Sequence, residues 1–218
     1  PTLQPEKVLN AEAMMIYKWL NVSVGYKYLK DVMEWTKYIY PGKEFAYNTS
    51  LNFDHKQLLY ASVNVSPKFG IFRPTWGFYY NQQFFDTKKY GASKALSKPL
   101  LSCSLNNSFA LSETMNAAIS LNAATTNADG FLMMKSNYSV NLQFDKSFAN
   151  RTWIIYLSAN DILKTAKERW TMYGLGSGTT KDCYNYTRNV SLQVTYNFNA
   201  KRSKYKGTGA GNEEKSRL

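Results

Sequence analysis

Hydrophobic and polar residues alternate in nine stretches of the chain, and the last stretch, VSLQVTYNF at Val190–Phe198, alternates without an exception. Successive side chains of a β-strand point to opposite faces, so each stretch has one apolar and one polar face. A period of two therefore predicts strands. The nine predicted strands are Val8–Tyr17, Leu20–Tyr28, Leu59–Val65, Thr75–Asn81, Leu101–Asn106, Met115–Leu121, Asn137–Phe144, Trp153–Asn160 and Val190–Phe198.

The two faces of each predicted strand need different surroundings. A soluble β-sandwich buries the apolar face in a protein core and exposes the polar face to water. A membrane barrel turns the apolar face to lipid and the polar face to a wet lumen. The strands approach the roughly ten residues that a tilted strand needs to cross a bilayer. Their polar faces carry Ser, Asn, Gln and Thr in place of the Lys and Glu of soluble surfaces, which favours the barrel.

The connections between the predicted strands alternate between short and long. Outer-membrane barrels have short turns on the inner side of the membrane and longer loops outside. We interpret Asp161–Tyr173 as an outer extension of the Trp153 strand. The short connections are Lys18–Trp19, Phe69–Arg73, Phe109–Glu113 and Asp145–Arg151; the longer ones are Asp31–Lys56, Asp86–Lys98, Thr125–Met133 and the segment before Val190.

Aromatic residues gather near the short connections. This bias predicts an aromatic girdle at one membrane interface, whereas the core of a soluble sandwich gives no reason for it. The residues concerned are Tyr17, Trp19, Phe69, Phe72, Trp76, Phe109, Phe144, Phe148, Trp153, Tyr196 and Phe198.

The nine predicted strands do not form a closed barrel by themselves. Pro1–Lys7 enters from the loop side, and nine strands leave the chain on the short-turn side after Phe198. Bacterial barrels normally have an even number of strands. Nine strands also leave two edges unpaired, which is costly in lipid. We therefore expect the C-terminal segment of a larger barrel, with further strands upstream.

Composition and charge narrow the function classes. The 218 residues are 44% hydrophobic and 16% aromatic, too apolar for a disordered chain. No long uncharged apolar run is present, so the chain meets a membrane through strands if at all. The net charge is +12, from 27 Lys and Arg against 15 Asp and Glu. These basic residues lie in turns, loops and the tail without a basic helical stripe, which disfavours nucleic-acid binding.

Residues for catalysis or metal binding are sparse. The single histidine, His55, is expected in a loop, without the partners that a metal site or a Ser-His triad needs. A disulfide between Cys103 and Cys183 is one alternative, and two free thiols are the favoured one. No residue is predicted to be catalytic, cofactor-binding or metal-binding, and no enzyme is expected. The carboxylates Asp54, Asp129, Asp145 and Asp161 are scattered at loop or strand ends.

The chain divides into a barrel segment, residues 1–199, and a basic flexible tail, residues 200–218. The tail contains GTGAG at Gly207–Gly211, which lacks the spacing of a phosphate-binding loop. No amphipathic helix follows to present a phosphate site, so we interpret the glycines as part of the flexible tail.

Three segments resemble a known family. The ending YNFNAKRSKYKGTGAGNEEKSRL is similar to the C-terminus of the outer-membrane β-barrel proteins of the Bacteroidetes, which resemble TonB-dependent receptors. The opening PTLQPEK resembles the N-P-x-L-x-P-E element found part-way along receptor barrels, with Thr2 at a departing position. WIIYLSANDILKT, centred on Asn160 and Asp161, resembles the family's penultimate-strand motif.

The resemblance implies an all-β, antiparallel outer-membrane barrel of about 22 strands whose lumen is closed by a plug. It implies uptake of large nutrients or siderophore-like ligands, energised by the inner-membrane TonB system through an N-terminal box. The implied partners are outer-membrane lipid, N-terminal strands and a plug outside these residues, the TonB system and an unidentified ligand, with no nucleic acid. Loop residues such as Lys37–Asn48 are candidates for ligand contact.

Two other functions stay open at this point. One is an outer-membrane structural or assembly barrel without transport, because a fold does not determine a function. The other is a secreted β-sandwich adhesin. An upstream TonB box would favour uptake, and lipid-attached quenchers reaching Trp76 and Trp153 would exclude the sandwich.

Overall fold

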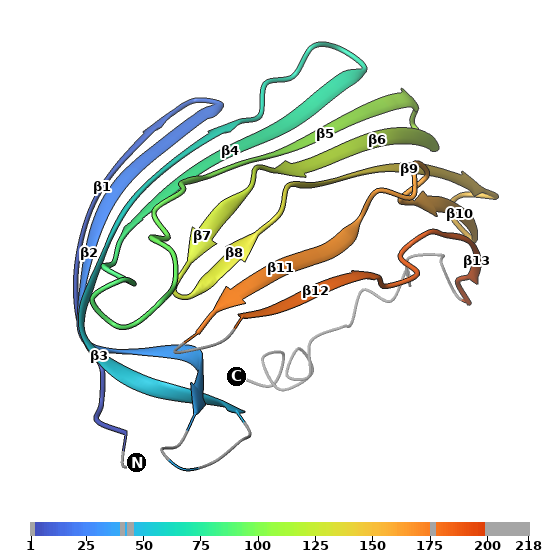
Figure 1. Ribbon diagram of the computed structural model, residues 1–218. Coiled ribbons are helices and arrows are strands. Elements are labelled where there is room, and N and C mark those ends of the chain that lie inside the picture. The colour runs from blue at the N-terminus through green and yellow to red at the C-terminus, as the bar shows by residue number, and fades with distance from the viewer. Residues whose placement is uncertain (1–2, 40–41, 43–45, 175–177, 199–218) are drawn as a thin grey trace, which may run out of the picture.

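The computed structural model describes residues 3–39, 42, 46–174 and 178–198 and contains 13 antiparallel strands in two sheets (Figure 1). Among these residues, no helix is long and apolar enough to cross a membrane. The nine-stranded sheet contains, in spatial order, β1 (Lys7–Tyr17), β2 (Leu20–Ile39), β3 (Ala46–Val65), β4 (Phe72–Phe84), β5 (Leu100–Ser112), β6 (Met115–Ala124), β9 (Asn137–Phe148), β10 (Trp153–Asn160) and β13 (Asn189–Tyr196). The four-stranded sheet contains β12 (Gly178–Tyr184), β11 (Lys167–Tyr173), β8 (Leu132–Met134) and β7 (Asn127–Asp129).

The large sheet confirms the nine predicted strands and their faces. Each strand pairs with its sequence neighbours along this sheet, and the register aligns the predicted apolar residues into continuous rows. The sheet curves, and the loop between β4 and β5 lies on its concave side (Figure 1). Gln83 contacts that loop, so the polar positions of β4 face inward and the apolar ones outward. One apolar row runs Met15, Val22, Val63, Phe78, Cys103, Ala123 and Tyr138.

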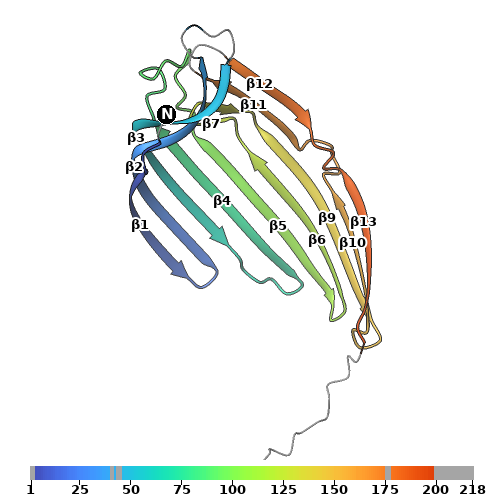
Figure 2. The ribbon, with the colours of Figure 1, turned by 90° about the horizontal axis from the view of Figure 1, so that it is seen from below.

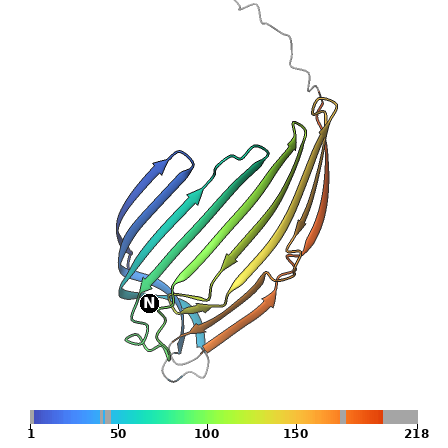
Figure 3. The same cartoon turned by 90° about the horizontal axis from the view of Figure 1, so that it is seen from above.

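The short turns all lie at one end of the sheet, as predicted (Figures 2 and 3). The end of β13 lies there too, because Asn197 donates its backbone N–H to the carbonyl of Thr152 at 2.8 Å. The N-terminal segment lies at the opposite end, where Gln4 and Asn52 exchange hydrogen bonds of 2.8 and 2.9 Å. The expected entry from the loop side and exit at the short-turn side are therefore confirmed.

The predicted long connection Asp31–Lys56 is wrong, because the chain there stays in β-structure. β2 and β3 continue beyond Asp31, which has a φ of 55°, and pairing passes from Lys30 opposite His55 to Val32 opposite Phe53. Asp31 and Asp54 thus form an irregularity in the pairing. Beyond it, the alternation of inward-facing and outward-facing side chains is shifted by one residue in both strands. We call the continuation from Val32 and back to Phe53 the arm.

The arm bends across the concave side and reaches the second sheet (Figures 1 and 3). Lys37 Nζ donates to Thr179 Oγ1 at 2.6 Å, and the rings of Trp35 and Trp170 meet edge to face at 6.2 Å. Gly174 lies so close to Lys37 that a side chain at position 174 would overlap it. The arm therefore joins β2 of the large sheet to β11 and β12 of the second sheet.

The second sheet continues four strands of the first. β7 follows β6, β8 precedes β9, β11 follows β10, and β12 precedes β13, each across a break of a few residues. The predicted Asp161–Tyr173 extension is thus a separate strand, β11, after a break. The connections expected at Thr125–Met133 and before Val190 also contain strands. The loop Asp86–Lys98 is confirmed.

Asp161 organises the junction between the two sheets. Its side chain is 2% exposed, and its φ is 46°. The carboxylate accepts hydrogen bonds from the backbone of Thr165 at 2.8 Å and Ala166 at 3.2 Å, and from the hydroxyls of Tyr184 at 3.1 Å and Thr187 at 2.7 Å. One carboxylate therefore ties the turn after β10 to the segment between β12 and β13, and this gives the Asn160–Asp161 motif a structural role.

A small core fills the loop end on the concave side. Phe53 from the arm packs against Phe85, Tyr90 and Phe131 with ring centroids 5.7, 4.9 and 5.0 Å away. Gln83 fastens the loop between β4 and β5 by donating to Leu96 O at 2.8 Å, and its Oε1 accepts from Gly130 N at 2.7 Å. The buried hydrophobic residues of this core are Val32, Phe53, Phe85, Ala92 and Phe131.

We predict that Asp161→Ala destabilises the junction by roughly 1–3 kcal/mol, because it leaves buried donors without an acceptor. The measurement is the temperature at which the unboiled protein loses its fast-migrating, folded band on a gel. Asp182→Ala, which removes an exposed carboxylate of β12, is the control. Equal melting temperatures for the two variants would contradict this role for Asp161.

Candidate functional site

The concave face of the large sheet carries a neutral, hydrogen-bonding surface. The polar halves of the predicted strands align in the same register as the apolar halves, so hydroxyl and amide side chains stand in rows. One row runs Ser23, Ser62, Tyr79, Ser102, Ala124 and Asn137, and the next runs Asn21, Asn64, Gly77, Ser104, Asn122 and Ser139.

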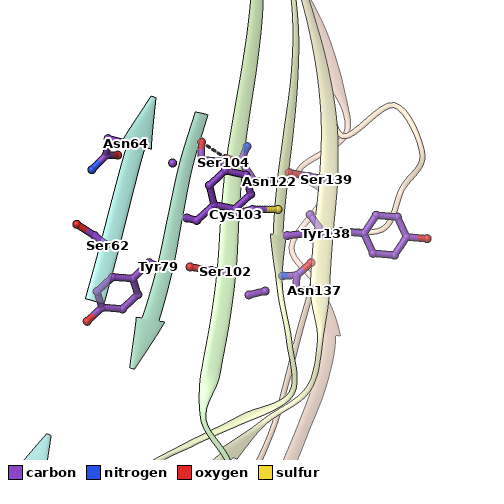
Figure 4. A pocket seen from close by; sticks show the side chains of 15 residues that line it. Ser62, Asn64, Tyr79, Ser102, Cys103, Ser104, Asn122, Asn137, Tyr138 and Ser139 are labelled. Carbon is purple, nitrogen blue, oxygen red and sulfur yellow. Dashed lines mark hydrogen bonds between the residues drawn. The ribbon is translucent and has the colours of Figure 1, made fainter. Parts of the chain in front are cut away.

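A hollow of about 530 Å³ lies on this wall. Side chains of β3, β4, β5, β6 and β9 surround it, with Asn64, Ser104 and Ser139 from one polar row (Figure 4). The ring of Tyr138 points away from the polar group, as alternation requires (Figure 4). Gly77, between Asn64 and Ser104, adds no side chain and so leaves space in the hollow.

Hydrogen bonds within the wall are incomplete. Ser104 Oγ donates to Asn122 Oδ1 at 2.9 Å, and the hydroxyls of Ser23 and Ser62 lie 2.9 Å apart. Within the part of the chain that the structure describes, the buried amide oxygens of Asn81 and Asn137 have no partner. Both side chains belong to the inward-facing set, and their amide oxygens are themselves buried.

A buried lysine at the loop end of the wall is paired with two carboxylates. Lys56 is 5% exposed, and its ammonium lies 2.7 Å from Glu34 Oε1 and 2.8 Å from Asp129 Oδ1. The three residues come from β3, the arm and β7, so the ion pairs also hold the arm in place. A buried lysine without these partners would carry a large desolvation cost.

The opposite, convex face matches the predicted lipid surface. Large apolar side chains stand exposed on it, for example Leu101 at 53% and Leu192 at 66%. At the short-turn end the rings of Trp153 and Tyr196 lie 4.5 Å apart, and Trp76 Nε1 donates to Asn107 Oδ1 at 3.0 Å. The predicted aromatic girdle is therefore present, with an indole N–H satisfied as interfacial tryptophans require.

The apolar band ends where the second sheet begins. Trp170 faces the arm, so alternation sends Lys167 and Thr171 to the outward face of β11. Such a face suits water rather than hydrocarbon. The second sheet therefore lies beyond the membrane-spanning part of the wall.

Glu168 is the most strongly perturbed carboxylate of the second sheet. Hydrogen bonds from Lys181 at 2.7 Å, Asn185 at 3.0 Å and the Trp170 indole at 3.0 Å lower the pKa of Glu168 to about 2. Its carboxylate fixes the orientation of the Trp170 ring.

The fold does not bring the histidine and the two cysteines together in a catalytic or metal-binding site. His55 is in β3 rather than in a loop, and it stacks on Tyr28 at 5.8 Å and contacts its sequence neighbour Asp54 at 3.1 Å. Cys103 and Cys183 are free thiols, as favoured, and they lie in β5 and β12. Among the described residues, no group of three or more His, Cys, Asp or Glu residues is placed to hold a metal ion. The tail at 200–218, with Gly207–Gly211, lies outside the described residues.

The sequence interpretation missed the arm and the second sheet. The candidate ligand loop Lys37–Asn48 is instead the far end of the arm, and part of it lies outside the described residues. The signal that was present is the pair Asp31 and Asp54, which marks the face change in both strands. Trp35 and Trp170 carry no local signal for their contact, since they are far apart in the sequence.

Comparisons with known proteins find one family and one solved structure. A family model described as "Outer membrane protein beta-barrel family" matches residues 1–196. Among solved structures, "OmpT (in-vitro folded), an outer membrane protein of Vibrio cholerae" is similar at a TM-score of 0.49 and 12% identity, over 88% of this chain and 55% of that one. The chain thus spans about half the length of that structure. No curated protein matches the sequence.

The low pKa of Glu168 gives a testable pH dependence. Because the folded-state pKa lies below the ordinary 4.5, the Glu168–Lys181 pair persists as pH falls past 4.5 and is lost near pH 2. Lys181→Met should move the midpoint up toward 4.5. Trp170 emission, taken as the difference from a Trp170→Phe variant, reports the titration. An unchanged midpoint in Lys181→Met would contradict the assignment.

Proposed function

The chain belongs to the outer membrane protein beta-barrel family, and on that premise we propose that its large sheet is part of the wall of a TonB-dependent-receptor-like transporter. The protein is an outer-membrane β-barrel protein, and it is located in the outer membrane. Its wall would line the path of a nutrient or siderophore-type ligand, without catalysis.

The observation that carries the proposal is a sheet with a wet face, an apolar face and two free edges. Within the described residues, β1 and β13 each pair with a single neighbour. In hydrocarbon an unpaired strand edge leaves backbone N–H and C=O groups without partners, at several kcal/mol per group. We therefore propose that further strands cover both edges. We propose that they belong to a barrel of about 22 strands, the size at which a lumen needs a plug.

The concave side supports ligand passage rather than a purely structural wall. Its hydroxyl and amide rows leave a hollow, which a tightly packed barrel interior would fill with side chains. The arm and the loop between β4 and β5 occupy the concave side at the loop end (Figure 1). A mouth occupied in this way suits energised transport through a plugged barrel better than free diffusion.

Filling the hollow tests transport directly. A chromosomal deletion should produce a growth defect on one or more members of a panel of nutrients and iron chelates, and the wild-type gene should restore growth. Gly77→Tyr, which places a ring in the hollow, should restore it at least several-fold less well. Ala117→Tyr adds the same ring to the convex face and should complement fully.

The same strains separate the alternatives. The unboiled protein of each variant should migrate as a folded barrel well above the mass expected for 218 residues. A deletion strain with no growth defect but a leaky, detergent-sensitive envelope would reject transport and favour a structural or assembly barrel. Release of the protein from the membrane fraction without detergent would contradict every function that requires a membrane barrel.

A further inference from the structure

Two lysines stand opposite each other at the loop end of the convex face. Lys7 of β1 pairs with Lys30 of β2, and Lys30 pairs with His55 of β3, so the three residues form one row across the sheet. The row belongs to the outward-facing set, because it lies two residues along from the outward pair Leu9 and Tyr28. Both lysines are exposed.

No carboxylate neutralises the two lysines within the part of the chain that the structure describes. Neither Lys7 nor Lys30 forms an ion pair there. Glu6 accepts a backbone N–H of the arm, Asp54 is shared by a histidine and a lysine, and Asp31 borders a hollow beside the N-terminal segment. Like charges directly opposite in an antiparallel pair are destabilising, so an anion bound between the lysines would relieve their repulsion.

The height of this row matches the outer boundary of the membrane. β1 has 11 residues from Lys7 to Tyr17, and Tyr17 belongs to the girdle at the short-turn end. The ends of such a strand are about 33 Å apart. At a tilt of about 40° this length spans a height of about 25 Å, which is the height of the apolar band of an outer-membrane barrel. Lys7 therefore lies at the outer edge of the band when Tyr17 lies at the inner edge.

Aromatic residues mark the same boundary. The outward row directly below the lysines contains Leu9, Tyr28, Gln57 and Phe84, and the ring of Tyr28 stacks on His55 with centroids 5.8 Å apart. Phe84 is 52% exposed. Aromatic residues are enriched at both interfaces of a membrane protein, so the next row outward meets lipid headgroups rather than hydrocarbon.

We propose that Lys7 and Lys30 bind the phosphate of a phosphate-bearing lipid in the outer leaflet of the outer membrane. A phosphate placed between the two ammonium groups accepts a charge-assisted hydrogen bond from each of them. Below the headgroup, the outward residues Ala11 and Ala13 of β1 leave space for an acyl chain against the sheet. The inference needs only the location in the outer membrane, so it does not depend on transport.

The test is lipid binding by the full-length protein, extracted from outer membranes in a neutral detergent and delipidated. The probes are lipid A with its phosphates, the same lipid after enzymatic removal of the phosphates, and inorganic phosphate. Wild type should bind the phosphorylated lipid most tightly. Lys7→Gln and Lys30→Gln should each raise its dissociation constant about fivefold, the loss expected for one lysine at a charged membrane surface.

A matched control makes the same change on the other face of β2. Lys27 alternates with Lys30 toward the lumen, opposite Asn10 and Leu58, so Lys27→Gln should bind lipid like wild type. Every variant must show the folded band before boiling. Equal affinity of wild type and Lys7→Gln/Lys30→Gln, or equal affinity for the phosphorylated and dephosphorylated lipids, would overturn the proposal. Inorganic phosphate bound as tightly as the lipid would replace it with a simple anion site.

Lys30→Glu separates lipid binding from folding. It places a carboxylate opposite Lys7, so the delipidated variant should melt at a higher temperature than delipidated wild type, while its affinity for phosphorylated lipid A falls. Parallel loss of melting temperature and lipid affinity would instead assign the lysines a structural role and contradict the site.

Discussion

The structure depends on one constraint, which is that backbone hydrogen bonds in a membrane must be satisfied between strands. The resulting ladders are continuous from β1 to β13, and their register decides which side chains meet lipid. Ala61 stands between Val24 and Tyr80, while the next residue, Ser62, stands between Ser23 and Tyr79. A slip of one residue in any pair would exchange these faces. The register that satisfies the backbone hydrogen bonds is therefore also the register that places apolar side chains on the lipid side and polar side chains on the lumen side.

The ladders are interrupted where the convex face stops being apolar. Asp31 and Asp54 turn β2 and β3 across the concave side, and Asp161 holds the break between β10 and β11 with its buried carboxylate. Irregular backbone costs little near the membrane surface, because backbone N–H and C=O groups that leave a ladder there can form hydrogen bonds with water or with side chains. The wall therefore ends in a water-exposed head made of the arm, the second sheet and the aromatic core around Phe53.

Local patterns were sufficient to predict the strands, the short turns and the aromatic girdle, because each of these features depends on residues that are close together in the sequence. The arm was not predictable in this way. After Asp31 the alternation continues with its faces exchanged, so that Val32 and Thr36 are buried inside. The polar wall was predicted, yet its hollow depends on the register that sets Gly77 between Asn64 and Ser104. The Trp35–Trp170 contact joins strands remote in sequence and leaves no local trace.

The most direct test of this account is the water accessibility of alternate residues in β9. Single cysteines are introduced into a Cys103→Ala/Cys183→Ser background and labelled in outer membranes with a charged, water-soluble maleimide. The account predicts labelling at one set of positions and protection at the other, whereas uniform labelling or the reverse pattern would contradict it. The positions to be labelled are Asn137, Ser139, Asn141 and Gln143, and those to be protected are Tyr138, Val140, Leu142 and Phe144.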